Sequence, residues 1–273
     1  MNWRSLADLQ AAVSAALPRL PRDVDAVVGI PRSGMLPATQ IALALELPLA
    51  DVRSAGWGRW WRRKTTPRVM PRRVLLVDDS ALRGRTMANA VDALRLRLPG
   101  VDVARVAVFV APGVAGVDIG LEVVDRPRVF EWNLWRHKHL GRVMTDLDGV
   151  LCVDPGEGDN DDGPAYERFL ASAAPLCLPR LPVAAVVTSR LERYREQTRR
   201  WLDAHGVRYG ALHMINLPTG AERRRRRVHV PHKAAVYQRS DALLFVESDP
   251  RQARAIARET GRPVLCWSTR RMA

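Results

Sequence analysis

Short apolar runs rich in Val and Leu alternate with longer amphipathic stretches along the whole chain. This alternation is typical of parallel sheets covered by helices. In the first half it predicts four strands, Asp25–Ile30, Leu49–Arg53, Arg73–Val77 and Val103–Val110, and two helices, Leu36–Glu46 and Thr86–Leu98. In the second half it predicts five strands, Arg142–Thr145, Val183–Val187, Leu212–Ile215, Ala242–Val246 and Pro263–Cys266, and three helices, Leu191–His205, His232–Arg239 and Pro250–Thr260.

A polar, aromatic segment, RVFEWNLWRHKHLGR, separates the last strand of the first half from the first strand of the second. We therefore expect two α/β domains, 1–138 and 139–273, each a mainly parallel sheet covered by helices. A chain of 273 residues with 47 % hydrophobic content is long enough for two such cores. Ligands of such sheets bind in loops beyond the carboxyl ends of the strands, so the chemistry is expected there.

Composition narrows the class of protein. The net charge of +14 would attract anionic metabolites or nucleic acid, but the Arg excess accompanies a general bias toward Ala, Val, Leu and Arg, so a polynucleotide partner is not the preferred interpretation. Three cysteines without ligand spacing suggest neither zinc nor disulfides, and His137, His139 and His232 also lack such spacing. No apolar run is long enough to span a membrane, so we expect a soluble, cytoplasmic protein.

The run RRVLLVDDSALRGRTM places Asp78 and Asp79 directly after an apolar strand and before a glycine-containing loop and a helix. Adjacent carboxylates at a strand end can hold vicinal ribose hydroxyls and the Mg²⁺ that accompanies a diphosphate. The loop from Ser80 to Thr86 can turn N–H groups and hydroxyls toward a phosphate at the helix N-terminus.

This run resembles the phosphoribosyl-diphosphate (PRPP) motif of type I phosphoribosyltransferases, and most closely its amidophosphoribosyltransferase variant. VVGIPRSGM, at the end of the first strand, is similar to the pyrophosphate loop of the same family. The resemblance implies that the acid pair holds the ribose hydroxyls and Mg²⁺. It implies that the remaining PRPP-binding residues are Ser80, Arg83, Gly84, Arg85 and Thr86 around the 5′-phosphate, Arg32, Ser33 and Gly34 near the diphosphate, and Lys64 in a closing loop.

The closing loop corresponds to GWGRWWRRKTTPRVM, which could instead be a solvated hairpin with a hydrophobic anchor. The acceptor is not identified by the sequence, because it would be bound by variable hood residues, here the N-terminal helix and the segment 130–135. No glutamine-amidotransferase half is present in the 273 residues.

RVMTDLDGVLCVD resembles the DxDGV signature of haloacid-dehalogenase-like (HAD) phosphatases, which implies a Rossmann-like fold. In this family the first acid, here Asp146, attacks phosphorus, and the second, Asp148, protonates the leaving oxygen. The resemblance also assigns Thr188 and Lys233 to the phosphoryl site. It assigns the Mg²⁺ site to Asp146, the backbone carbonyl of Asp148, Glu247 and Asp249, although VESD departs from the usual final motif. A metal-binding but non-catalytic site is the alternative.

Asp148 and Thr188 lie 40 positions apart, and a segment of this length is too short for a large cap domain. The tract PGEGDNDDGP between them is equally consistent with a disordered loop. The arginine run 223–227 is either an anion-binding loop or, as we prefer, a solvated stretch.

The two resemblances together imply a bifunctional enzyme of nucleotide metabolism. The first domain would transfer phosphoribosyl from PRPP to a small-molecule acceptor, and the second would remove a phosphate from the product. The domain pairing is similar to that of proteins of tellurium-resistance stress operons. Independent salvage or degradation activities and a PRPP-sensing nucleic-acid-binding regulator are the alternatives, and a homodimer is left open.

Overall fold

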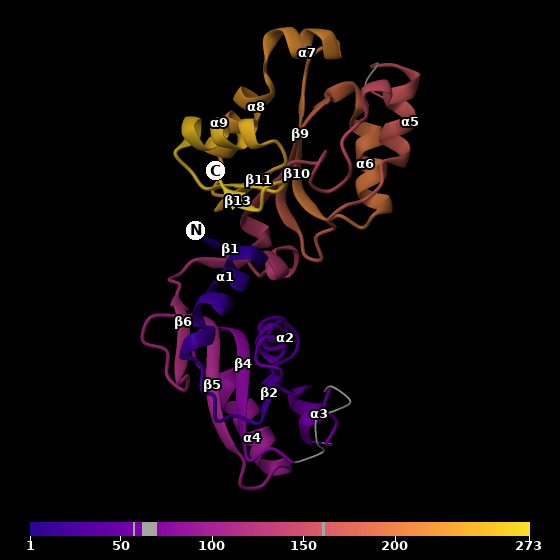
Figure 1. Ribbon diagram of the computed structural model, residues 1–273. Coiled ribbons are helices and arrows are strands. Elements are labelled where there is room, and N and C mark those ends of the chain that lie inside the picture. The colour runs from indigo at the N-terminus through magenta and orange to yellow at the C-terminus, as the bar shows by residue number, and fades with distance from the viewer. Residues whose placement is uncertain (57, 62–69, 160–161) are drawn as a thin grey trace. The chain divides into compact units, whose positions relative to one another are not determined.

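The computed structural model describes residues 1–56, 58–61, 70–159 and 162–273 (Figure 1). The chain forms two compact units, Asn2–Arg128 and Val129–Ala273, the latter with Met1. The division thus lies earlier in the chain than the expected boundary at 138/139. The segment expected in the acceptor hood of the first domain contributes to the second unit, where the Trp135 ring lies 5.3 Å from that of Trp267 and its carbonyl accepts from Arg180 N at 2.8 Å.

The first unit is built on a parallel five-stranded sheet of order β3-β2-β4-β5-β6. The strands of this sheet are β2 (Ala26–Gly29), β3 (Leu49–Asp51), β4 (Arg73–Ala81), β5 (Asp102–Val110) and β6 (Ile119–Val123), and β1 (Asn2–Arg4) lies outside it. Its helices are α1 (Leu6–Ala16), α2 (Met35–Ala44), α3 (Val52–Gly56) and α4 (Arg85–Arg97), with a 3₁₀ helix at Leu17–Arg19. β7 (Arg128–Phe130) contains the division between the units.

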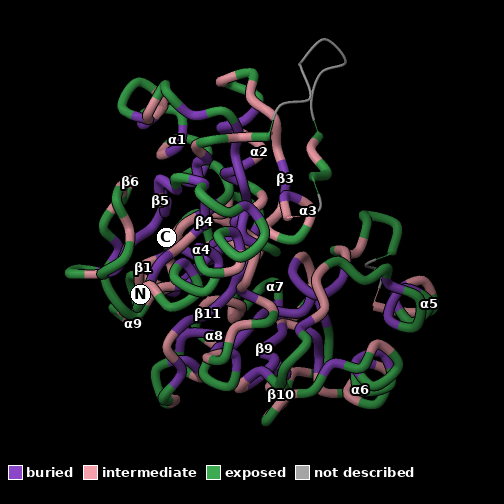
Figure 2. Tube along the Cα trace, turned by 90° about the horizontal axis from the view of Figure 1, so that it is seen from below, coloured by how far each residue is buried: buried purple, intermediate pink, exposed green. Residues whose placement is uncertain are grey.

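The core of this unit lies on the central strand. Val74–Val77 of β4 are fully buried because neighbouring strands and helices cover both faces (Figure 2). Met87, Ala90, Val91 and Leu94 give α4 an apolar stripe at helical spacing that joins the same cluster.

Two predicted elements of the first unit have different ends in the structure. The predicted strand Leu49–Arg53 stops at Asp51, because the Asp51 carboxylate accepts hydrogen bonds from Arg53 N and Ser54 N and starts α3. β4 extends beyond Val77 to Ala81, since pairing with β5 continues through this stretch. The two acidic residues therefore lie within the strand.

The second unit has a six-stranded sheet of order β10-β9-β8-β11-β12-β13, parallel except for β13. Its strands are β8 (Val143–Thr145), β9 (Val183–Leu191), β10 (Tyr209–Ile215), β11 (Leu244–Glu247), β12 (Val264–Cys266) and β13 (Arg271–Met272). Its helices are α5 (Pro164–Ser172), α6 (Arg195–Ala204), α7 (Gly220–Arg226), α8 (His229–Gln238) and α9 (Pro250–Thr260). Short 3₁₀ helices cover Glu131–Arg136, Leu140–Arg142, Glu157–Asp159 and Glu192–Tyr194.

The prediction of a mixed α/β chain with parallel sheets is confirmed, whereas α5, α7 and β13 were not predicted. The predicted helix Leu191–His205 starts late, at Arg195, because β9 continues to Leu191 and a 3₁₀ turn follows. The insert between β8 and β9 holds α5 and one 3₁₀ turn in its described part. Within the described ranges, no helix combines the length and apolar character needed to cross a membrane.

Candidate active sites in the two units

The first candidate site is a pocket of about 290 Å³ where β4 passes into α4. It is lined by Asp78, by the run Ser80–Thr86 and by Met87. Five of the residues predicted to surround a sugar 5′-phosphate, Ser80, Arg83, Gly84, Arg85 and Thr86, therefore share one cavity with the first acid. The N–H groups that begin α4 lack intrahelical acceptors and favour an anion at this end of the pocket.

Two buried acidic side chains lie next to each other in this site. Asp78 and Asp79 are both buried, and Asp78 Oδ1 accepts from Asp79 N at 2.9 Å. Burial, and then the neighbouring Asp79, raise the pKa of Asp78 to about 8. A cation between these carboxylates and a diphosphate would offset the repulsion between the two acids, so the residues fit the implied Mg²⁺.

Two glycines allow the loops of this site to approach. Gly84 adopts φ +71°, and a Cβ there would lie 2.2 Å from Ala115 O. At Gly34 a Cβ would lie 2.9 Å from Asp78 Oδ1. The loop VVGIPRSGM is therefore packed directly against the acid motif, although the two are far apart in sequence.

The remaining predicted residues of the first site are placed differently. Arg32 is exposed, and the carbonyls of Arg32 and Ser33 accept from Met35 N and Leu36 N at the start of α2. Neither lines the pocket. Lys64 lies outside the described residues.

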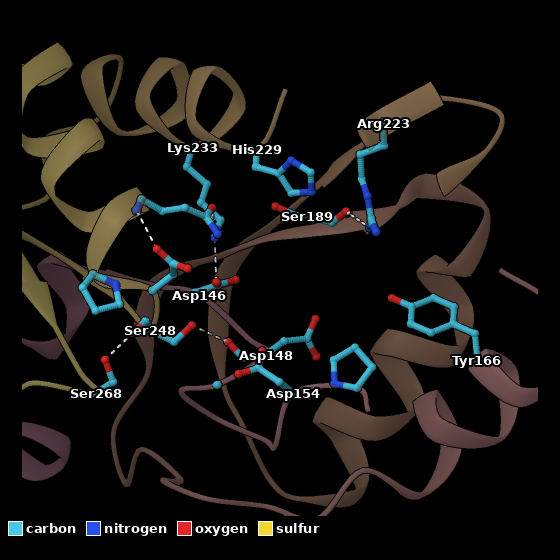
Figure 3. A pocket seen from close by; sticks show the side chains of 15 residues that line it. Asp146, Asp148, Asp154, Tyr166, Ser189, Arg223, His229, Lys233, Ser248 and Ser268 are labelled. Atoms are coloured by element: carbon cyan, nitrogen blue, oxygen red, sulfur yellow. Dashed lines mark hydrogen bonds and ion pairs between the residues drawn. The ribbon is translucent and has the colours of Figure 1, made fainter. Parts of the chain in front are cut away.

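The second candidate site lies at the carboxyl ends of β8 and β11, where one buried lysine joins two buried carboxylates. Lys233 Nζ, from α8, donates to Asp146 Oδ2 at 2.6 Å (Figure 3). It also donates to Glu247 Oε2 at 2.7 Å. Burial raises the pKa of Asp146, and Glu247 adds to this while Lys233 opposes it. Burial would lower the pKa of Lys233, but the two carboxylates raise it above its ordinary value, so the lysine stays charged.

The second acid is held by an arginine that the sequence did not suggest. Arg190, on β9, is 1 % exposed and donates through Nε and Nη2 to the Asp148 carboxylate at 2.6–3.2 Å. Its Nη2 also lies 3.4 Å from Cys152 Sγ. Although burial opposes it, Asp148 keeps the pKa of Arg190 above its ordinary value. The Asp148 side chain is thereby fixed in one orientation.

A pocket of about 560 Å³ opens above these groups. Its lining includes Asp146, Asp148, Asp154, Tyr166, Ser189, Arg223, His229, Lys233, Ser248, Asp249, Gln252 and Ser268. Thr188 is not among the lining residues: it is fully buried, and its hydroxyl accepts from Arg190 N at 3.2 Å. The neighbouring Ser189 faces the pocket in its place.

The predicted acids of the last motif also separate. Glu247 is fully buried against Lys233 and lies behind the pocket wall. Asp249 lines the pocket, while its Oδ1 accepts from Arg251 N and Gln252 N and caps α9. The Asp148 carbonyl accepts from Ser248 Oγ at 3.2 Å.

The balance of acidic and basic side chains in the second site decides whether a metal ion would fit there. Among the described residues, no three His, Cys, Asp or Glu side chains are arranged as a ready metal cluster. Carboxylates nevertheless outnumber cations around this end of the pocket: Asp146, Asp148, Asp154 and Asp249 line it and Glu247 lies behind it, whereas the cations are Lys233 in the lining and the buried Arg190. Loss of solvent, then Asp148 and Glu247, raise the pKa of Asp154. This surplus of oxygen donors fits a divalent cation.

Sequence reasoning missed several residues of this site. Arg190 follows Thr188 by two positions, and a charged residue ending an apolar strand was the available signal. Arg223 was seen only as part of an arginine run. Tyr166 lies on α5, which was not predicted, and His229 lies just before the predicted start of α8.

Comparisons with known proteins bear on the first unit. Residues 3–127 match the family model of the phosphoribosyl transferase domain. No curated protein matches the chain.

Solved structures similar to the chain include purine phosphoribosyltransferase from Pyrococcus horikoshii Ot3, with 18 % identity, 48 % of this chain and 92 % of that chain covered, and a TM-score of 0.36. The Helicobacter pylori xanthine-guanine-hypoxanthine phosphoribosyltransferase is 14 % identical, with 48 % of this chain and 92 % of that chain covered and a TM-score of 0.39. Orotate phosphoribosyltransferase from Aeropyrum pernix is 24 % identical, with 43 % of this chain and 71 % of that chain covered and a TM-score of 0.32. Because these TM-scores are low, the domain assignment rests on the family match.

Proposed function

We propose, from the phosphoribosyl transferase domain that residues 3–127 match, that the chain is a bifunctional enzyme. Its first unit transfers the 5-phosphoribosyl group of PRPP to a small-molecule acceptor and releases pyrophosphate. Its second unit hydrolyses a phosphomonoester, which we take to be the 5′-phosphate of the first product, as a HAD-like phosphatase. The observation that carries the second part is the buried Asp146–Lys233–Glu247 contact beside the Arg190–Asp148 pair.

In the first unit, the residues act by position and charge. The loop of the 290 Å³ pocket and the N-terminus of α4 bind the 5′-phosphate, while Asp78 and Asp79 hold the ribose hydroxyls. The bond from the anomeric carbon to the diphosphate breaks, and the acceptor nucleophile forms the new bond to that carbon. The VVGIPRSGM loop, which packs on Asp78 through Gly34, would contact the departing diphosphate.

In the second unit, an Asp146 carboxylate oxygen attacks phosphorus, and the bond from phosphorus to the leaving oxygen breaks. Asp148 gives its proton to that oxygen and then removes a proton from the water that hydrolyses the aspartyl-phosphate. Lys233 donates to the Asp146 carboxylate and opposes the rise in its pKa that burial causes. Mg²⁺, when bound near Asp146, the Asp148 carbonyl and Glu247 or Asp249, would neutralise charge on the phosphoryl oxygens.

Arg190 is a positioning residue in this scheme. Its guanidinium contacts the Asp148 carboxylate through two nitrogens, so the proton donor keeps one orientation before substrate arrives. Since Arg190 is itself buried and hydrogen-bonded to Thr198 Oγ1 at 3.4 Å, the carboxylate is attached to the sheet and α6. Independent salvage activities of the two units would use the same residues.

The test is a product analysis with purified protein, PRPP, Mg²⁺ and a pool of nucleobases and small amines, read by mass spectrometry. We expect the native protein to yield a ribosylated, dephosphorylated product and Asp146→Asn to accumulate its phosphorylated form. Asp241→Asn, which changes an exposed acid of the same unit, should behave like the native protein. Hydrolysis of p-nitrophenyl phosphate is measured separately on all three proteins.

The two activities can fail independently. Pyrophosphate release that is absent with every acceptor would contradict the transferase assignment and favour a PRPP-sensing role. Absence of p-nitrophenyl phosphate hydrolysis in the native protein, or equal hydrolysis by Asp146→Asn, would contradict the phosphatase assignment.

A further inference from the structure

The 560 Å³ pocket of the second unit has two chemically different ends. The carboxylates and Lys233 occupy one end, where the proposed phosphoryl transfer takes place. Arg223, Ser189, His229 and Tyr166 occupy the other, and Figure 3 shows Arg223 directed toward Ser189 and apart from Asp146. The second end plays no part in the mechanism described above.

Arg223 differs from the other arginines of its helix. It is 8 % exposed, whereas Arg225 and Arg226 are exposed and pair with Glu222. Arg223 Nη1 donates to Ser189 O at 2.6 Å. Among the described residues, its buried Nε has no hydrogen-bond partner and no carboxylate forms an ion pair with it.

A buried guanidinium without a counter-ion is costly unless an anion completes it. Ser189 Oγ, beside it, is also buried and unpartnered within the described part of the chain. Burial, and then the charges of Arg223 and Lys233, lower the pKa of His229 to about 4. The imidazole is therefore neutral and does not repel the Arg223 guanidinium. Three polar groups thus face one region of the pocket without a carboxylate ligand among them.

We infer that Arg223 and the Ser189 hydroxyl bind a second anionic group of the substrate while its scissile phosphate lies at Asp146. The substrate class is therefore a phosphomonoester or diphosphate that carries a further phosphate or carboxylate, which in the product of the first unit would belong to the acceptor, and simple phosphomonoesters are poor substrates. This inference rests on the proposed phosphatase function, and it names the specificity of that same pocket.

The first test measures binding without turnover. Calorimetry in the presence of Mg²⁺ compares methylphosphonate with methylene-, ethylene- and propylenediphosphonate and with phosphonoacetate. We expect at least one two-anion ligand to bind roughly ten- to a hundredfold more tightly than methylphosphonate, as a charge-assisted guanidinium contact would give. The best linker length reports the span between the two ends, and phosphonoacetate separates carboxylate from phosphate recognition.

The matched variants are Arg223→Gln and Arg225→Gln, which remove the same charge from the same helix. Arg223→Gln should abolish the preference for two anions and leave methylphosphonate binding within about threefold. Arg225→Gln should keep the preference, because its side chain is exposed. Chelation of Mg²⁺ by the diphosphonates is common to all variants and cancels in the comparison.

Kinetics separate the inference from the function on which it rests. With native protein hydrolysing p-nitrophenyl phosphate, a loss of kcat/KM in Arg223→Gln confined to two-anion substrates supports the inference. An equal loss on both substrate classes would overturn it in favour of a structural role. No preference in binding or kinetics, while p-nitrophenyl phosphate is hydrolysed, refutes the inference alone, and no hydrolysis of any substrate refutes the phosphatase and the inference with it.

Discussion

Replacing Asp78 by Asn should stabilise the first unit and at the same time impair it. Asp78 is buried next to Asp79, and its pKa is raised from an ordinary value of 3.8 to about 8. Between these values the folded unit holds a proton that the unfolded chain has released. Stability therefore falls as pH rises through this interval, and the loss is complete above pH 8.

The size of the effect follows from the interval. At about 1.36 kcal/mol per unit of pKa difference, the penalty accumulated between the ordinary pKa of 3.8 and pH 7 is roughly 4 kcal/mol. Asp78→Asn removes the ionisable group and keeps its shape, so it should raise the free energy of unfolding by this amount at pH 7 and very little at pH 4. PRPP binding should weaken in the same variant, because the carboxylate that holds ribose and metal is gone.

The assay is a urea titration at several pH values, followed by a brief deuterium pulse at one common pH and mass spectrometry of peptides from β4 and β5, which report the first unit alone. Asp92→Asn, an exposed acid on α4, is the control and should follow the native protein. If the free energy of unfolding of Asp78→Asn depends on pH as it does in the native protein, the Asp78 carboxyl does not cause this pH dependence.

Three further predictions concern the glycine turn, the proton donor and the metal. Gly84→Ala should destabilise the first unit by roughly 2–4 kcal/mol, because φ is positive at this position and the new Cβ would clash with Ala115 O. Gly100→Ala should cost only about 1 kcal/mol, because its φ is also positive, +81°, but no atom lies near its Cβ position. Equal losses of stability in urea unfolding would rule out the clash. Arg190→Lys should lower kcat about tenfold for alkyl phosphates but little for p-nitrophenyl phosphate, whose leaving group needs no proton from Asp148. The control Arg193→Lys should leave kcat unchanged for both substrates. Equal losses of kcat on both substrates in Arg190→Lys would indicate misfolding. Mg²⁺ at a hundred times its Kd should stabilise the second unit by about 2.7 kcal/mol in thermal unfolding, and an unchanged midpoint would argue against the site.

Local motifs made much of this architecture predictable. Asp146 and Asp148 follow the end of β8, and Asp78 and Asp79 lie in the last part of β4, so their neighbourhoods follow from the order of strands. The parallel sheets also follow from the alternation of apolar and amphipathic runs.

Side-chain direction was less predictable. Thr188 and Ser189 are adjacent, and only the register and packing of β9 decide that Ser189 lines the pocket while Thr188 is buried. Arg223 resembles its neighbours in sequence, and its burial follows from the way α7 packs. The boundary between the units differs because Trp135 packs on Trp267, a contact between residues far apart in the chain.

The Arg190–Asp148 pair joins a loop after β8 to the adjacent strand β9, and the Arg190 guanidinium lies over the Phe169 ring of α5, 5.8 Å from its centroid. The Asp148 carboxylate is thus held from the sheet, with α5 packed against its partner, while Tyr166 of α5 lines the pocket. The insert between β8 and β9 therefore has two separable parts: Phe169 packs on the support of Asp148, and Tyr166 lines the pocket. In the proposed phosphatase, changes in the insert that keep Phe169 would alter the pocket lining without realigning Asp148, which gives this small domain room to evolve new substrates.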